Sequence, residues 1–177
     1  MGLGNPDPKY QNTYHNIGIL AIRWLAKKWS GNKGIPPKWK KLKNLFQYTK
    51  IGALTFVEPL VHMNEIGKAA IAGFKRFKAA PAEFLVIQDD SDLSLGEFRL
   101  SFNRGSAGHK GVESIIKSLG NKGFWRMRIG IRKEAWERQK AGEFVLKEIS
   151  PINKKIFLSV FEKIEETIKS AIQRESH

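Results

Sequence analysis

The chain has 177 residues, of which 41% are hydrophobic, and it contains no cysteine. This length is typical of one compact domain, so we expect residues 1–177 to form a single domain with its own core. The lack of cysteine excludes disulfide bonds and cysteine-based metal sites, which fits a reducing compartment and predicts a cytoplasmic protein. The sequence shows no signal-peptide pattern and no apolar stretch long enough to span a bilayer, so we expect no membrane partner.

The charge is strongly positive, with 31 lysines and arginines against 17 acidic residues and a formal net charge of +14. Residues 8–57 contain no acidic residue and also hold three tryptophans, Trp24, Trp29 and Trp39. A long block of one sign attracts polyanions, so it favours a nucleic acid as partner over a basic face that is merely solvated. The basic residues of this block are Lys9, Arg23, Lys27, Lys28, Lys33, Lys38, Lys40, Lys41, Lys43 and Lys50.

The first half of the chain predicts two helices and one strand. Residues 2–8 are typical of a tight polar loop. Apolar residues then recur at helical spacing, which predicts a helix over residues 16–29. Residues 31–44 contain two prolines and read as an exposed basic connection. Residues 54–57 predict a strand, and residues 65–77 a second helix, which Gly67 and Gly73 weaken.

The second half predicts three more strands and two more helices. Residues 84–88 are continuously apolar, as in a strand of a parallel sheet buried on both faces. Residues 98–102 and 125–131 alternate between apolar and polar, which predicts half-buried strands. A glycine loop, 105–111, leads into a helix, and Ser150-Pro151 begins another that runs to about residue 172. The alternation predicts an α/β fold: a single three-layer domain with a mixed, mostly parallel sheet flanked by helices.

Polar residues that could do chemistry occur where the predicted strands end and loops begin, which is where open α/β sheets bind ligands. They are Asn5, His15, Asn64, Asp89 and His109. A histidine beside a carboxylate makes an oriented general base, and asparagine amides can hold a carbonyl and its developing oxyanion. No serine or cysteine lies in a nucleophile-elbow pattern. Water is therefore the expected nucleophile, and hydrolysis of an ester or amide the expected reaction.

The acidic run Asp89-Asp90-Ser91-Asp92 leaves two interpretations open. Its carboxylates could bind Mg²⁺, because oxygen ligands suit that ion. They could equally accept hydrogen bonds from backbone amides in a turn.

Four ordered segments resemble the bacterial peptidyl-tRNA hydrolase family. They are GLGNPDPKYQNTYHNIG (2–18), PLVHMNEIG (59–67), FLVIQDDSDLSLGEFRL (84–100) and GSAGHKGVESIIKSLG (105–120), the last followed by FWRMRIGI (124–131). Their order and spacing run through most of the chain, to about residue 150. The resemblance implies hydrolysis of the ester bond between peptide and tRNA in peptidyl-tRNA, which frees the tRNA for reuse.

The resemblance also implies residue roles. His15 matches the base that activates water, and Asp89 the carboxylate that orients it. The positions implied to bind substrate are Asn5, Tyr10, Met63, Asn64, His109 and Lys110. Those implied to grip tRNA phosphates are Arg104 and Arg128. The family requires no metal and no organic cofactor, and its members are usually monomers.

The sequence departs from the family at several positions. Lys110 stands where an asparagine is usual, which removes an acceptor and adds a charge. Ser101 stands where a phosphate-binding lysine is common, and Arg104 could replace that lysine. Arg132 and Asp7 each replace a usual glycine. Members also have a short apolar strand before GLGNP, so either an edge of the sheet is missing or the start of the sequence is shortened.

Two alternatives to an active esterase remain, the first from these departures and the excess of basic charge, the second from the acidic run. One is a weak or inactive homologue that acts as an RNA-binding module. The other is a metal-dependent nuclease that uses Asp89, Asp90 and Asp92.

Overall fold

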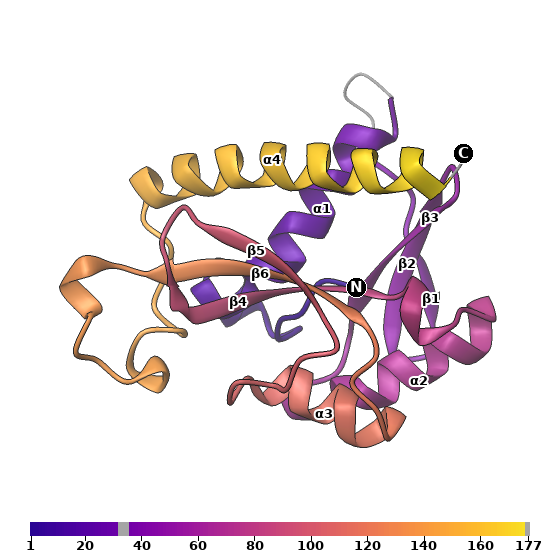
Figure 1. The fold of residues 1–177 in the computed structure, drawn as a ribbon, viewed down its shortest axis with the longest axis horizontal. Coiled ribbons are helices and arrows are strands. Elements are labelled where there is room, and N and C mark those ends of the chain that lie inside the picture. The colour runs from indigo at the N-terminus through magenta and orange to yellow at the C-terminus, as the bar shows by residue number, and fades with distance from the viewer. Residues whose placement is uncertain (32–35, 176–177) are drawn as a thin grey trace.

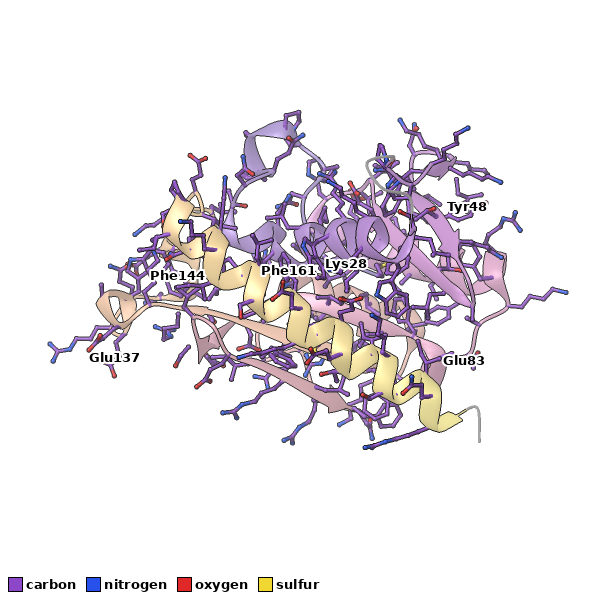
Figure 2. The ribbon with its side chains drawn as sticks, turned by 90° about the horizontal axis from the view of Figure 1, so that it is seen from above. Lys28, Tyr48, Glu83, Glu137, Phe144 and Phe161 are labelled. Carbon is purple, nitrogen blue, oxygen red and sulfur yellow. The ribbon has the colours of Figure 1, made fainter. Side chains whose placement is uncertain are left out.

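The computed structural model describes residues 1–31 and 36–175, and it has three layers, with a central sheet between two pairs of helices (Figure 1). Helices α1 (Ile17–Trp29) and α4 (Pro151–Glu175) cover one side, and α2 (Ile66–Phe77) and α3 (Lys110–Leu119) cover the other. Figure 2 views the molecule from the α4 side, with this long helix in front of the rest of the chain. No helix within the described ranges is both long and apolar enough to cross a membrane.

The strands form two three-stranded groups. In the first, β1 (Lys40–Leu42), β2 (Phe46–Ile51) and β3 (Leu54–Pro59) pair antiparallel in that order. In the second, β6 (Trp125–Arg132) lies between β4 (Leu85–Ser94) and β5 (Phe98–Phe102), parallel to β4 and antiparallel to β5.

Residues 1–3 connect the two groups. The Gly2 amide donates to the carbonyl of Val57 in β3 at 3.1 Å, and the Leu3 amide donates to that of Ile87 in β4 at 2.8 Å. Gly2 also forms a parallel bridge with Ile87. Residues 1–3 therefore make sheet contacts with β3 and β4. This is the position at which the family resemblance raised the question of a missing sheet edge.

Two apolar clusters form the core, one on each side of the sheet. Neighbouring residues of β4 divide between them, because successive side chains of a strand point to opposite faces. Ile87 packs with α1 and α4, whereas Val86 packs with α2 and α3. The three-layer α/β prediction is confirmed by this arrangement.

The sheet is mixed, as predicted, but it is not mostly parallel. Among the named strands of the described chain, only β4 and β6 pair parallel. Connections decide this balance, since a parallel pair needs a long crossover and a short turn reverses direction. Helix α3 supplies the crossover between β4 and β6, whereas Gly52 and Ala53 alone separate β2 from β3.

The apolar face of β5 is less buried than predicted, although Phe98 at its start packs against the core. Leu100 and Phe102 were expected on a buried face, but they are 42% and 43% exposed. The cause is the strand order, which places β5 at the edge of the sheet. Trp125, the partner of Phe102 across the strands, is likewise exposed.

The basic block of residues 8–57 is partly structural. Its tryptophans pack against the core rather than forming an exposed aromatic surface, and Trp29 donates to Glu165 at 2.8 Å. Arg23 pairs with the buried Glu58 at 2.6 Å. The expected connection 31–44 contains strand β1, while residues 32–35, including Lys33, lie outside the described residues.

The start of α1 lies directly on the backbone of β4 and of residues 1–3. A Cβ added at Gly18 would lie 2.2 Å from the carbonyl oxygen of Ile87, and one added at Gly2 would lie 2.2 Å from that of Gly18. Glycine is therefore required at both positions for this approach. The approach brings His15, just before α1, to the end of β4.

Candidate active site

A pocket of about 670 Å³ lies where β4 ends and where α1 and α3 begin. It is the edge at which the sequence predicted a site. The predicted catalytic and substrate-binding residues all line it: Asn5, Tyr10, His15, Met63, Asn64, Asp89, His109 and Lys110.

The centre of the pocket is the carboxylate of Asp89, which is 2% exposed and holds two histidines. Nδ1 of His15 lies 2.9 Å from Oδ1 and 3.0 Å from Oδ2 of Asp89. Nε2 of His109 lies 3.0 Å from Oδ1. Burial alone would raise the pKa of Asp89, but the two histidines, through their hydrogen bonds and through positive charge when protonated, hold it well below its usual range. Asp89 is thus an anion in the folded protein.

The hydrogen bonds of His109 assign its tautomer. Its Nδ1 accepts from the backbone amides of Gly111 at 3.1 Å and Val112 at 3.4 Å, capping the start of α3. A nitrogen that accepts carries no proton, so the proton of neutral His109 resides on Nε2 and is donated to Asp89. Both ring nitrogens are then engaged. His109 lines the pocket, but this geometry orients Asp89 rather than offering a free nitrogen to substrate.

His15 has the opposite arrangement, with one nitrogen engaged and the other available. Its Nδ1 donates to Asp89, and no hydrogen bond to its Nε2 occurs within the described part of the chain. Burial lowers the pKa of His15, but the charge of Asp89 and the hydrogen bond to it raise the pKa more, so that it ends above its ordinary value. The positive charge of Lys110 opposes this rise. The ring is therefore an oriented base whose unprotonated form Lys110 favours.

Asn5 is fixed by reciprocal hydrogen bonds with Asn16. The Asn5 amide donates to Oδ1 of Asn16 at 2.8 Å, and Nδ2 of Asn16 donates to the carbonyl of Asn5 at 2.9 Å. Oδ1 of Asn5 also accepts from the amide of Met63 at 2.9 Å. These contacts leave Nδ2 of Asn5 as a donor toward the pocket, suited to a carbonyl oxygen.

The remaining predicted substrate residues form the rim and floor of the pocket. Met63 is buried, whereas Asn64 and Lys110 are exposed. Tyr10 is half-buried, with Nζ of Lys9 4.8 Å from its ring centroid. Lys110 is the first residue of α3, where the helix dipole adds to its positive charge.

The two arginines expected to grip tRNA lie outside the lining of this pocket. Arg128 donates through Nε to Oδ2 of the buried Asp90 at 2.6 Å. Burial lowers the pKa of Arg126 most, and the charges of Arg128 and of the exposed Arg104 lower it further. Arg104, Arg126 and Arg128 thus form a group of cations near β6. The two arginines of β6 lie on the face of the strand opposite Met127 and Ile129.

The acidic run does not gather into one cation site. Asp89 faces the histidines and Asp90 faces Arg128, while Oδ1 of Asp90 accepts from the amide of Asp92 at 2.9 Å. Asp90 does accept from a backbone amide, as the turn interpretation expected, but the run lies within strand β4 and not in a turn. One ligand atom each from His15, Asp89 and His109 lie within 4.8 Å of one another, a grouping that metal sites also use. Their hydrogen-bond distances are those of a carboxylate receiving two N–H donors.

Three positions that shape this region were not predicted from the sequence. Asn16 holds Asn5, but a buried asparagine before a helix looks like an ordinary cap. Arg126 is 2% exposed, and its Nε and Nη1 have no partner within the described residues. Arg132 was noted only as a departure from the family, yet it donates to the carbonyl oxygens of Ser91 and Trp136 at 2.5 and 2.7 Å.

Comparison with known proteins agrees with this site. A family model described as peptidyl-tRNA hydrolase matches residues 1–177. The peptidyl-tRNA hydrolase of Aquifex aeolicus is 35% identical over 98% of this chain and 88% of its own length. That of Thermodesulfovibrio yellowstonii is 37% identical over 97% of this chain and 89% of its own length.

Solved structures agree as well. A peptidyl-tRNA hydrolase in complex with N-propanol has a TM-score of 0.82 and 25% identity, over 97% of this chain and 86% of that one. For the fold alone, the enzyme of Acinetobacter baumannii has a TM-score of 0.82 at 24% identity, over 99% of this chain and 88% of that one. On the strength of the match along its whole length and of these relatives, the chain belongs to the peptidyl-tRNA hydrolase family.

Proposed function

We propose that this protein hydrolyses the ester bond between peptide and tRNA in peptidyl-tRNA and so releases free tRNA for reuse. One observation carries the proposal, the arrangement of His15. Its Nδ1 is hydrogen-bonded to the buried Asp89, while its Nε2 has no hydrogen-bond partner among the described residues. His15 lines a pocket large enough to hold an ester. Family membership supplies the substrate class.

The chemistry follows from the positions of the polar atoms. A water at Nε2 of His15 gives up a proton to that nitrogen as its oxygen attacks the ester carbonyl carbon. Asp89 stabilises the imidazolium that forms. The amides of Asn5 and Asn64 bind the carbonyl oxygen as it becomes an oxyanion, and Lys110 adds a positive charge nearby. The ribose 3′ oxygen then leaves and takes the proton back from His15.

We assign the peptide to the pocket between Tyr10, Met63 and Asn64, and His109 to orienting Asp89. The acceptor arm of the tRNA lies against the cations around β6, with Arg104 and Arg128 contacting phosphates. The net charge of +14 supports this, because phosphate binding releases condensed counterions. We further propose that the protein works as a single-domain monomer in the cytoplasm, without metal or cofactor.

A single-turnover assay with N-acetylated aminoacyl-tRNA tests the proposal. We expect cleavage by the unaltered protein and loss of cleavage in His15→Ala. His62→Ala is a matched control, because His62 also lines the pocket but is exposed, and the histidines hydrogen-bonded to Asp89 are His15 and His109. Tight tRNA binding without cleavage would overturn the proposal and leave an RNA-binding module.

A chelator separates this mechanism from a metal-dependent nuclease. Addition of EDTA should leave the rate unchanged, and the products should be intact tRNA and free peptide. Loss of activity that Mg²⁺ restores, or a shortened tRNA, would contradict the proposed reaction.

A further inference from the structure

One wall of the pocket comes from the segment between β6 and α4, which contributed no residue to the expected site. Ala141, Gly142, Val145 and Leu146 of this segment line the pocket. All four lack a charged or hydrogen-bonding side chain. With Met63 and Tyr10, this wall supplies the apolar part of the pocket lining.

The wall is fixed to the backbone around His15. The His15 amide donates to the carbonyl of Val145 at 2.8 Å, and the Tyr14 amide donates to that of Lys147 at 3.3 Å. The Ile149 amide then donates to the carbonyl of Asn12 at 2.8 Å. Val145 and Leu146 therefore occupy a set position beside the base.

Leu146 is unusual because it is large, apolar and 48% exposed. Its exposure does not come from a loose loop, since Phe144 is fully buried two positions before it and Ile149 nearly so three positions after it. An apolar side chain held at the open side of a pocket is available to bind an apolar ligand group.

Arg132 connects this wall to the end of β4. Its Nε donates to the carbonyl of Ser91 at 2.5 Å, and its Nη1 donates to the carbonyls of Trp136, Glu137 and Gln139 at 2.7, 3.1 and 3.3 Å. Ser91 follows Asp89 by two residues. One guanidinium thus joins the strand that carries Asp89 to the loop that carries the wall.

Aromatic packing supports the same connection. The guanidinium of Arg132 lies 5.2 Å from the ring centroid of Phe144, and that ring stacks on Trp136 with centroids 4.9 Å apart. Trp136 also meets the edge of Tyr14, the neighbour of His15, at 5.2 Å. Removing Arg132 would remove its hydrogen bonds to residues 136–139 and its contact with Phe144, and so loosen the loop, while the backbone hydrogen bonds to residues 12–15 remain.

We propose that Val145 and Leu146 form an apolar subsite for the side chain of the amino acid esterified to the tRNA, and that Arg132 is the positioning residue for this subsite. The inference rests on the proposed hydrolysis. The attacked carbonyl carbon must lie about 3 Å from a water on His15. The α-carbon is bonded directly to that carbonyl, so its side chain falls beside the residues that adjoin His15. The subsite favours leucine-like over small side chains.

The test compares N-acetyl-leucine with N-acetyl-alanine carried by the same tRNA body. The unaltered protein should show the higher kcat/KM for the leucyl substrate. Leu146→Ser should reduce that preference about tenfold, as removal of apolar contact does in other specificity pockets. Leu158→Ser is the matched control, because Leu158 is 46% exposed on α4 and does not line the pocket. Val145→Ala provides a second, milder change.

Arg132→Gly tests the positioning role. We expect loss of the leucyl preference through KM more than through kcat, together with faster hydrogen exchange of the amides of residues 133–147. A merely structural role would lower kcat/KM for both substrates by one factor. An unchanged leucyl-to-alanyl ratio in Leu146→Ser would overturn the subsite while leaving the hydrolysis intact. Failure of the unaltered protein to cleave either substrate would instead overturn the proposed function and the subsite with it.

Discussion

Asp89 and Asp90 are neighbours on β4, both carboxylates are buried and both residues line the pocket, yet they bind different partners. Asp89 holds His15 and His109, whereas Asp90 holds Arg128 at 2.6 Å. The difference arises from the pleat, which sends successive side chains to opposite faces. One strand end can therefore support proton transfer on one face and a cationic surface on the other.

From this comparison we expect that single substitutions can alter catalytic turnover without altering RNA binding, and the reverse. A change at Asp89 alters the base but leaves the cations around β6 in place. A change at Asp90 releases Arg128 but leaves both histidines bonded. The predictions below test this separation.

The largest expected effect is that of Asp89→Asn. The amide cannot stabilise an imidazolium as a carboxylate does, so kcat should fall roughly 10²- to 10⁴-fold. Single-turnover rates at saturating enzyme measure this loss. The Kd for uncharged tRNA should remain unchanged.

Asp90→Asn is the matched control for that prediction. It removes the same charge from the same strand, and kcat should change by no more than a few fold, because Asp90 lines the pocket but bonds Arg128 and the amide of Asp92 rather than a histidine. Equal losses of kcat in the two variants would show that the two faces are not separable.

A smaller effect is expected for Arg128→Met. Loss of one phosphate contact should raise KM about tenfold with kcat unchanged and lower the salt dependence of binding, measured as log K against log salt, by about one. Arg104→Met should act in the same direction. Arg76→Met, on the exposed surface of α2, serves as the control. A reduced kcat with unchanged KM in Arg128→Met would contradict the assignment to tRNA binding.

Local pattern sufficed for most elements of the fold. The helical spacing of apolar residues and the capping residues predicted α1, α2 and α4 to within a few residues. The spacing is informative because each of these helices buries one face. The hairpin of β2 and β3 was missed in part, since Gly52-Ala53 is a weak turn signal and residues 46–51 mix polar and apolar types. The exposure of Leu100 depended on strand order, which no local pattern contains.

The residues of the site could be predicted only where the chemistry of the side chains and the family resemblance pointed to the same positions. Residue types pointed to His15 and Asp89, but residues 89 and 109 lie far apart in sequence, so no spacing could show that one carboxylate binds both histidines. That His109 caps α3 through Nδ1 of its side chain is seen only in the structure. The pairing of Asp90 with Arg128 was likewise hidden, because the acidic run offered a cation site and a turn with equal weight.

The smallest effect, and one confined to the catalytic side of the comparison, is expected for Lys110→Asn. The general base must be unprotonated, so kcat/KM should rise with pH through the pKa of His15, which lies above its ordinary value. The charge of Lys110 lowers that pKa, and removing the charge should move the rising limb to higher pH. Lys117→Asn, near the other end of α3, should leave the limb in place, since Lys117 does not line the pocket. Because a shifted limb lowers the rate only below the new pKa, the two proteins should converge at high pH if Lys110 acts through His15 alone. A rate that stays lower in Lys110→Asn at every pH would show instead that the ammonium contacts the substrate or its oxyanion, and the position would then belong to the catalytic residues proper.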